Sequence, residues 1–324
     1  MTSTQTTNRT PMRSVVALAG GVGGAKLAHG LYGSLPADAL TVVVNTADDF
    51  VHWGLNISPD LDTVMYTLAG IANEATGWGV ADETWIALAA IGRLQGETWF
   101  RIGDQDLATH LRRTEALRAG VSLSAITARM AAALGIRAAL LPMSDDRVAT
   151  MVRTPDGLLG FQDYFVRRQH RDAVQGIELQ GIDTAAVTPS AGEAIRTADA
   201  IIFCPSNPIV SIGPILALAG MRELLGSRTV PRVAVSPIVG GKALRGPADA
   251  MLQGLGHEPS ALGVARIYQG LLTGMVVDDL DADQAEAIRA LGMDVLVTNT
   301  IMRTIDDRRR LASVILDWCA ISYD

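Results

Sequence analysis

The chain has 324 residues and is 48% hydrophobic, which is enough apolar material for one large α/β core. Its formal charge is -7, from 27 basic and 34 acidic residues, and this excludes nucleic acid as the main partner because phosphate-backbone binding needs a basic face. Charges or prolines interrupt every long apolar run before it reaches membrane-spanning length. We therefore expect a cytoplasmic protein with no membrane partner.

Three local features describe the ends and the unusual residues of the chain. Residues 1–12 are polar and rich in Thr, which predicts a disordered leader. Cys204 and Cys319 lie in apolar surroundings and are interpreted as buried thiols of a reducing compartment. The consecutive arginines at 308–310 are interpreted as a solvated helix face.

The first predicted element is a strand over residues 15–18, a short apolar run suited to burial on both faces. A helical pattern follows, which we expect to begin near Gly24 and to end at Gly30 or Gly33. Four glycines separate the strand from the helix: Gly20, Gly21, Gly23 and Gly24.

This glycine-rich turn is typical of a phosphate-binding loop. Glycines let the backbone approach a ligand closely, and the first turn of the helix offers unpaired N–H groups and the positive end of its dipole. Lys26 adds a mobile cation, but Leu27 follows it, so neither the Walker pattern nor the G-x-G-x-x-G fingerprint fits. The sequence predicts a different nucleotide-phosphate binder, with a tight turn that binds nothing as the alternative.

A second buried strand at residues 40–45 follows one helix later, the spacing of a right-handed βαβ unit. Four carboxylates follow it within a short polar span: Asp48, Asp49, Asp60 and Asp62. Because the carboxyl ends of parallel strands carry the ligand site, these acids should face the same crevice as the glycines. Alternatively, Ser58 and Asp60 only begin a helix, with Ser58 as its N-cap.

The middle of the chain has a helical pattern first and a strand pattern after it. Residues 63–141 are mostly helical in pattern and too long for one crossover, so we expect an inserted helical subdomain that contains His110, which is either a site residue or a satisfied core histidine. Residues 147–166 alternate around a turn at 155–157 and predict an antiparallel hairpin, with a further strand at 178–182.

The last third returns to buried strands. Strands are predicted at 200–204, 232–237, 274–278 and 294–298, before a helix at 305–319, and the first two run into loops rich in Ser, Pro and Gly. We find no internal repeat. The expected fold is a single α/β domain over residues 13–324, Rossmann-like, with a mostly parallel sheet, helices on both faces, the helical insertion and a small antiparallel hairpin.

Seven motifs, in order between about residue 13 and residue 318, resemble the 2-phospho-L-lactate transferase family. They occupy residues 20–26, 45–49, 58–63, 103–110, 141–146, 206–215 and 235–240. The resemblance implies transfer of a phosphate-bearing three-carbon unit from a guanosine diphosphate-linked donor to the ribityl hydroxyl of the deazaflavin Fo. GMP is released, and the product leads to coenzyme F-420.

The glycine loop also indicates a branch of that family. Val22 and Gly24-Ala25 stand where archaeal relatives tend to carry Thr and Thr-Pro, so the chain resembles the actinobacterial branch, which uses a phosphoenolpyruvyl donor. These loop residues do not identify the donor directly, so a 2-phospholactyl donor is the alternative. The alternative is a regulator that binds nucleotide sugars without turnover, as in the related gluconeogenesis factors.

The implied reaction is attack of an alcohol on one phosphorus of a diphosphate, so catalysis is mainly alignment and charge neutralisation. Glycine-loop amides with Lys26 and Lys242 supply part of the positive charge, and Mg²⁺ supplies the rest. Asp49 and Asp62 are the predicted Mg²⁺ ligands and, with His110, the predicted catalytic residues. Asp48 and Asp60 are alternatives for the general base.

The resemblance implies two groups of substrate-binding residues and a homodimer. The donor nucleotide and its phosphates are assigned to Gly20, Gly21, Val22, Gly23, Gly24, Lys26, Ser206, Asn207, Ser211, Ser236 and Gly240. The acceptor Fo is assigned to Thr46, Asp48, Trp53, Asp104, Ser144 and Asp145. Phe50 and Trp99 are further candidates for the wall of an aromatic slot that holds the deazaflavin ring.

Overall fold

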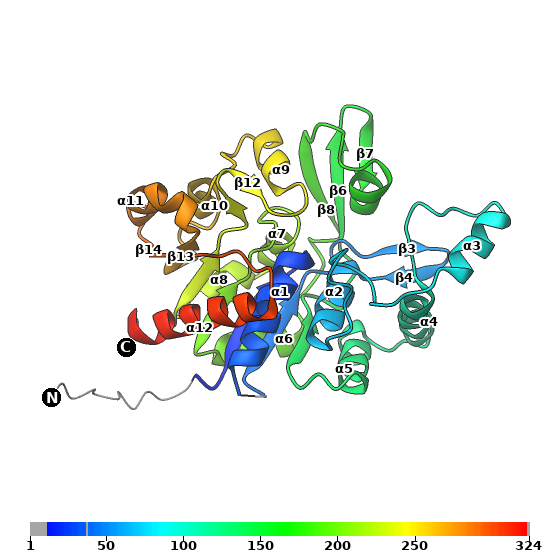
Figure 1. Ribbon diagram of the computed structural model, residues 1–324, viewed down its shortest axis with the longest axis horizontal. Helices are drawn as coiled ribbons and strands as arrows, with labels where there is room; N and C mark the ends of the chain where they lie inside the picture. The colour runs from blue at the N-terminus through cyan, green and yellow to red at the C-terminus, as the bar shows by residue number, and fades with distance from the viewer. Residues whose placement is uncertain (1–11, 37, 323–324) are drawn as a thin grey trace.

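The computed structural model describes residues 12–36 and 38–322, and the predicted leader lies outside them except for Met12. A seven-stranded parallel sheet in the order β14-β13-β10-β9-β1-β2-β5 forms the centre (Figure 1). Its strands are β1 (Val15–Ala19), β2 (Leu40–Val44), β5 (Ala139–Pro142), β9 (Ala200–Phe203), β10 (Arg232–Val235), β13 (Gly274–Val277) and β14 (Asp294–Val297). This confirms the predicted α/β class and the predicted strands, except that β14, at the edge of the sheet, is half-buried to exposed and not buried.

Alternating side chains of each strand enter two separate hydrophobic layers. In β1, Val15 and Ala17 pack with one layer, whereas Val16 and Leu18 pack with the other. The first layer is covered by α1 (Gly21–Ser34), α2 (Pro59–Leu68), α5 (Leu123–Ala133) and α12 (Ile305–Ser322). The second is covered by α6 (Pro189–Thr197), α7 (Ile212–Ala217), α8 (Met221–Gly226), α10 (Ala261–Ile267) and α11 (Ala285–Arg289). Helices therefore cover both faces, as expected.

The order of the strands indicates where a ligand would bind. The chain proceeds outward from β1 through β2 to β5, then returns to β9 on the other side of β1. In such an open sheet, ligands bind outside the carboxyl ends of the strands at the point where the direction reverses. That point lies between β1 and β9.

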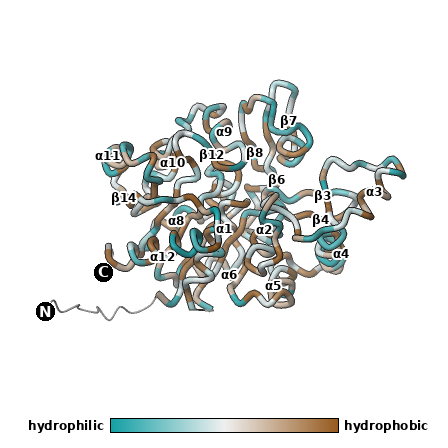
Figure 2. The backbone as a smooth tube through the Cα atoms, viewed as in Figure 1, coloured by the Kyte–Doolittle hydropathy of each residue, from teal (hydrophilic) through white to brown (hydrophobic). Residues whose placement is uncertain are grey.

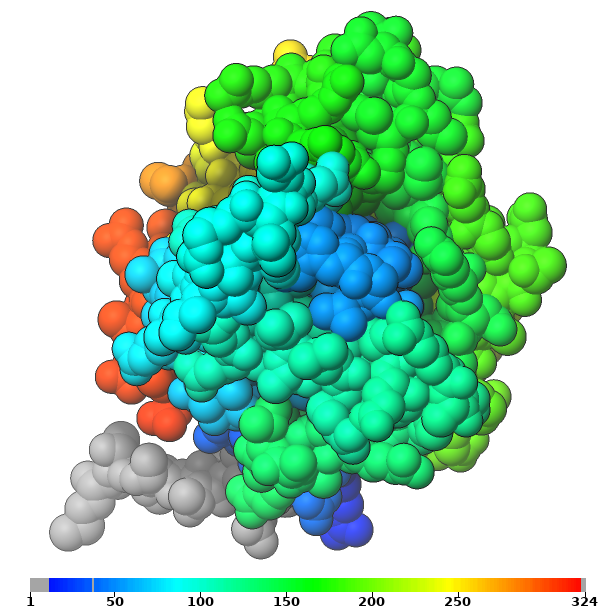
Figure 3. All heavy atoms as spheres, turned by 90° about the vertical axis from the view of Figure 1, so that its right-hand side faces the viewer, coloured from blue at the N-terminus to red at the C-terminus, as the bar shows by residue number. Residues whose placement is uncertain are grey.

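The segment between β2 and β5 holds the predicted helices and one element that the sequence analysis missed. The hairpin of β3 (Phe50–His52) and β4 (Leu55–Ile57) precedes α2, and α3 (Ile86–Arg93) and α4 (Asp104–Arg118) follow before α5. Figure 1 shows this hairpin with α3 and α4 extending away from the central sheet, and Figure 3 views the molecule from that side.

A second, antiparallel sheet stands over the strand ends. It has the order β7-β6-β8, from β6 (Ala149–Thr154), β7 (Gly157–Gly160) and β8 (Gly176–Gln180), which confirms the predicted hairpin. The predicted third strand lies two residues earlier than expected. A two-stranded hairpin, β11 (Ile238–Val239) with β12 (Lys242–Ala243), follows β10, and α9 (Ala248–Gly254) comes next.

Helix α1 begins at Gly21, three residues before the predicted start near Gly24, and runs through Gly30 to Ser34, one residue beyond Gly33. Helix α12 crosses it at Gly30, where a Cβ would lie 2.2 Å from the carbonyl oxygen of Arg308. Arg308 itself is buried and ion-paired with Glu74, so the arginine triplet is not simply a solvated face. Gly30 therefore permits helix packing and does not end the helix.

This contact predicts effects of different size at Gly30 and Gly33, which lie three residues apart in α1. Gly30→Ala should reduce the free energy of unfolding by about 1–3 kcal/mol, because the added methyl group forces α12 away. Gly33→Ala should change it by less than about 1 kcal/mol in either direction, because its nearest neighbour is the mobile Arg309 side chain at 3.2 Å. Urea denaturation of both variants checks this, and equal destabilisation would contradict it.

The distribution of hydrophobic residues agrees with this fold. Figure 2 shows brown, hydrophobic segments gathered along the central strands, in agreement with the two buried layers. No helix in residues 12–36 and 38–322 is long and apolar enough to cross a bilayer. The apolar side of α12, with Leu311, Ile315 and Cys319, packs on the sheet within one chain. Cys204 is also a buried free thiol.

Candidate functional site

A cavity of about 860 Å³ opens at the carboxyl ends of the strands, where the topology predicts a site. The glycine loop, α2, α4 and the segment after β7 that carries Phe161 and Phe165 all contribute to its wall, as do the loops after β9, β10 and β14. Its volume lies within the range of small-molecule binding sites.

The glycine loop is held to the loop after β9 by reciprocal hydrogen bonds. The amide of Gly20 donates to Ser206 Oγ at 3.0 Å, and the same hydroxyl donates to the Gly20 carbonyl at 2.8 Å. A Cβ on Gly23 would lie 2.3 Å from the carbonyl oxygen of Pro205, so a side chain there would push the two loops apart. The absence of a side chain at Gly23 thus allows the two loops to pack closely, while the predicted close approach of a ligand stays a prediction.

Asp48 and Asp60 form a buried acidic pair on the cavity wall. Asp60 accepts the Gly21 amide at 2.7 Å and the Asn45 side-chain amide at 3.0 Å. Burial raises the pKa of Asp60 to about 6, and burial together with the charge of Asp60 raises the pKa of Asp48 well above its usual value. Among the described residues, no lysine or arginine forms an ion pair with either, and Asp48 Oδ1 is buried without a hydrogen-bond donor.

This pair fits a divalent cation better than the predicted pair does. Asp62 is buried in a two-pronged ion pair with Arg113, whose Nη1 lies 3.0 Å from Asp62 Oδ2, so a guanidinium already holds the cation position. Asp49 is not part of the cavity wall and accepts the Ser58 hydroxyl at 2.6 Å. Hard cations such as Mg²⁺ need carboxylate oxygens that are free to coordinate. Asp48 Oδ1 and Asp49 Oδ1 are both buried without a hydrogen-bond donor among the described residues, but of the two residues only Asp48 lines the cavity.

A second acidic group lies further along the wall, on α2 and α4. Asp62, Asp106 and His110 could each offer one atom to a metal, with all three atoms within 4.8 Å of one another. Arg113 contacts two of the three, so the positive charge that such a cluster needs is already present. We therefore assign no metal to this group.

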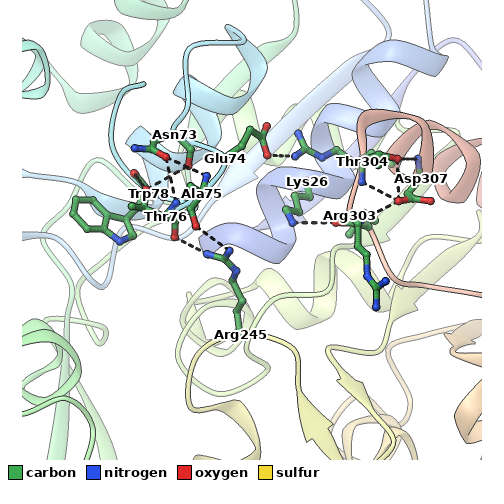
Figure 4. A network of polar contacts seen from close by, with 12 residues as sticks. Lys26, Asn73, Glu74, Ala75, Thr76, Trp78, Arg245, Arg303, Thr304 and Asp307 are labelled. Atoms are coloured by element: carbon green, nitrogen blue, oxygen red, sulfur yellow. Dashed lines mark hydrogen bonds and ion pairs between the residues drawn. The ribbon is translucent and has the colours of Figure 1, made fainter. Parts of the chain in front are cut away.

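Part of the cavity wall is cationic: Lys26, Arg245 and Arg303 line it, and Figure 4 draws these three side chains. Lys26 donates to the Met302 carbonyl at 3.0 Å, and burial and the neighbouring Arg308 and Arg245 lower its pKa. Arg245 donates to the carbonyls of the segment that carries Trp78, at Thr76 and Ala75. Arg303 also lines the cavity. These arginines were missed because nothing in their local sequence marks them, whereas the predicted Lys242 is exposed and outside the wall.

Another part of the wall is aromatic. Phe161 and Phe165 stack with ring centroids 5.5 Å apart, and Trp99 and Phe100 line the same cavity with their rings 5.7 Å apart at a steep angle. Phe50 packs edge-on behind Phe100 at 4.8 Å and does not itself line the cavity. A flat polycyclic ligand fits such a slot.

The structure brings most of the predicted donor residues together. The wall contains Gly20, Gly21, Val22, Gly23, Lys26, Ser206, Asn207, Ser211 and Ser236. Gly24 lies behind it, where a Cβ would meet the Ser206 hydroxyl, and Gly240 donates its amide to Asp281.

The predicted acceptor residues are less well placed. Only Asp48 of that group lines the cavity; Thr46, Trp53, Asp104, Ser144 and Asp145 do not. Asp104 accepts the first amides of α3, Asp145 accepts the Ser124 amide in α5, and Ser144 donates to the Ala186 carbonyl. These contacts stabilise loops and helix ends, which gives each residue a structural reason to be polar.

Comparisons with known proteins agree with the geometry. The family model described as "2-phospho-L-lactate transferase CofD" matches residues 15–306. The chain is 45% identical to a phosphoenolpyruvate transferase of Streptomyces griseus, covering 94% of this chain and 97% of that one. It is 38% identical to a 2-phospho-L-lactate transferase of Methanosarcina mazei, with 93% and 99% covered.

A solved structure shares the fold. A protein of the UPF0052 family from Bacillus halodurans superposes with a TM-score of 0.66 at 16% identity, covering 95% of this chain and 99% of that one. This likeness supports the α/β architecture.

Proposed function

The chain belongs to the CofD family of 2-phospho-L-lactate transferases, and we propose from this that it transfers a phosphoenolpyruvyl group from a guanosine diphosphate-linked donor to the deazaflavin Fo. The relatives support transfer of a phosphoenolpyruvyl or 2-phospholactyl group in coenzyme F-420 biosynthesis. The acceptor is the ribityl hydroxyl of Fo, and GMP is the leaving product.

The choice of donor rests on the relatives. Three Streptomyces proteins named phosphoenolpyruvate transferase are 43–45% identical to this chain, whereas four methanogen proteins named 2-phospho-L-lactate transferase are 38–40% identical. This difference and the Val22 and Gly24-Ala25 loop favour the enolpyruvyl donor.

One observation carries the proposal: a single cavity joins a glycine loop and a cationic part of its wall to an aromatic slot. Loop amides, Ser206 and Lys26 suit a diphosphate, and the slot around Trp99 and Phe161 suits a flat tricyclic ring. Both substrates would then lie in one enclosure, so that the protein supplies alignment for a direct displacement at phosphorus.

Asp48 and Asp60 would hold the Mg²⁺ ion that the family implies. When bound, this ion would neutralise part of the diphosphate charge, and Lys26, Arg245 and Arg303 on the cavity wall would offset the rest. Asn45 holds Asp60 in place through its side-chain amide, and the Gly21 amide fixes the other oxygen. The residues thus orient the acidic pair toward the glycine loop.

Magnesium should stabilise the protein in a pH-dependent way. Metal binding requires ionised carboxylates, and the pKa of Asp60 is about 6, so Mg²⁺ should raise the thermal midpoint at pH 7.5 and much less at pH 5.5. Thermal-shift titrations with MgCl₂ at both pH values check this, with Asp60→Asn as the control that abolishes the response. A response equal at both pH values would contradict it.

A product assay tests the proposed function. Purified protein, Fo and Mg²⁺ are incubated with the enolpyruvyl or the lactyl donor in separate tubes, and products are weighed by mass spectrometry. We expect Fo plus phosphoenolpyruvyl together with GMP, and no product in EDTA. Binding of guanine nucleotide without product in either tube would overturn the proposal and favour the nucleotide-binding regulator.

We also propose that the enzyme acts in the cytoplasm as a homodimer. Exposed apolar side chains on and beside α3, Ile86 and Leu94, are available for an interface. Light scattering should give twice the 34.2 kDa chain mass.

A further inference from the structure

Three buried polar side chains on α2 and α4 meet at the cavity wall: Tyr66, Asp106 and His110. The Tyr66 hydroxyl donates to Asp106 Oδ1 at 2.7 Å. His110 Nε2 lies 3.2 Å from the same oxygen. Both contacts converge on Oδ1, and among the described residues no donor reaches Oδ2, which is therefore the oxygen available to a ligand.

Arg113 determines which nitrogen of His110 carries the proton. Its Nη1 lies 3.3 Å from His110 Nδ1, and a guanidinium can only donate. Nδ1 must therefore accept, so the proton of the neutral imidazole sits on Nε2, which faces Asp106. Nδ1 thus uses its lone pair toward Arg113, and Nε2 carries a proton that lies near Asp106 Oδ1 without completing a hydrogen bond. His110 therefore has no lone pair left for a proton from a substrate.

We propose that Asp106 is the catalytic residue that accepts the proton of the acceptor hydroxyl, and that His110 is a positioning residue that orients it. This inference rests on the proposed function. The hydroxyl oxygen forms a bond to the phosphorus that carries the three-carbon group. The bond from that phosphorus to the bridging oxygen breaks, and GMP leaves with the electron pair. The proton passes to Asp106 Oδ2 and then to water.

The other acids of the site are less suited to this task. Asp62 is neutralised by Arg113, and Asp49 is outside the cavity wall. Asp48 and Asp60 lie at the glycine loop, where the diphosphate is expected. In a loose phosphoryl-transfer transition state the attacking hydroxyl loses its proton late. The carboxylate that accepts this proton must therefore be ionised and directed at the hydroxyl, but it does not need to be a strong base.

The surroundings keep Asp106 ionised. Burial alone would raise the pKa of Asp106, but the contact with His110, supported by Tyr66 and Arg113, holds it below its usual value. The charged or titratable groups that face it are His110 and Arg113 from α4 and Asp62 and Tyr66 from α2, while Glu83 accepts its backbone amide.

Kinetics of Asp106→Asn test the proposal directly. We expect kcat to fall by at least about 10²-fold with little change in KM for the donor, because a positioned base contributes roughly 10²–10⁴-fold. Glu115→Gln, a change on the exposed side of the same helix, is the matched control and should keep the parent rate. If Asp106→Asn does not fold, Asp106→Ala in the presence of formate replaces it, with recovery of rate by formate expected.

Two His110 variants separate the roles of base and orienter. His110→Gln keeps a donor toward Asp106 and should lose less than about tenfold in rate, whereas His110→Leu removes the donor. Loss of that donor raises the pKa of Asp106, so the acidic limb of the kcat/KM profile should move to higher pH in His110→Leu only. A general base at His110 would instead remove the limb in both variants.

The outcomes are distinguishable. Asp106→Asn within tenfold of the parent, no recovery with formate in Asp106→Ala, or His110→Gln as inactive as Asp106→Asn would overturn the inference while the parent enzyme still makes product. No product from the parent enzyme with either donor would instead show that the proposed function is wrong.

Discussion

Replacement of Asp48 by Asn is expected to reduce the transfer rate by about 10³-fold, because losing several kcal/mol of charge stabilisation at the diphosphate costs tenfold per 1.36 kcal/mol. The same change at Asp49 should cost less than about tenfold, since that side chain lies outside the cavity wall and contacts Ser58. The two residues are adjacent in the chain, so each variant is a close control for the other.

Rates at saturating Fo and donor, measured over a range of Mg²⁺ concentrations, decide between the two aspartates. For Asp48→Asn we expect a higher Mg²⁺ requirement as well as a lower maximum rate. A larger loss in Asp49→Asn than in Asp48→Asn would restore the assignment based on sequence alone and contradict the site described above.

The second large effect is on stability. Arg113→Met should lower the free energy of unfolding by about 3–5 kcal/mol, because it leaves the buried Asp62 carboxylate without a partner. The double variant Asp62→Asn/Arg113→Met should recover part of this loss, since no unpaired charge is then buried.

Urea denaturation of the parent, both single variants and the double variant measures this coupling. A loss below about 1 kcal/mol in Arg113→Met would mean that the pair is worth no more than an exposed salt bridge. In that case Arg113 could not be the group that fixes Asp62 and the His110 tautomer.

The elements around the glycine loop could be predicted because their patterns are local. A buried strand, four glycines and a helix with its N–H groups exposed specify the loop without knowledge of distant residues. The strands at 200–204 and 232–237 were likewise evident from apolar runs, and the rules for parallel sheets placed their loops at one edge.

The sequence alone could not show which of the four aspartates is left without a cationic partner. Asp60 and Asp62 are two residues apart on α2, so their side chains point in different directions around the helix. Asp60 meets the Gly21 amide, 39 residues earlier, whereas Asp62 meets Arg113, 51 residues later. Only the packing of α4 on α2 determines which carboxylate keeps a free charge.

The same limit applies to Arg308 and to the hairpin of β3 and β4. The partner of Arg308 is Glu74, 234 residues away, and nothing near either residue indicates the pairing. Residues 50–57 form a hairpin through a turn in which Trp53 takes a positive φ of 52°, a conformation that non-glycine residues rarely adopt.

The central claim is direct transfer between two substrates held in one cavity, and a single-turnover reaction in H₂¹⁸O tests it most directly. With stoichiometric Fo and enolpyruvyl donor, mass spectrometry should find no ¹⁸O in either GMP or the Fo product, because the ribityl oxygen itself attacks the phosphorus. Incorporation of ¹⁸O into GMP or into released phosphoenolpyruvate would show that water is the nucleophile, and the account of a transferase site would be contradicted.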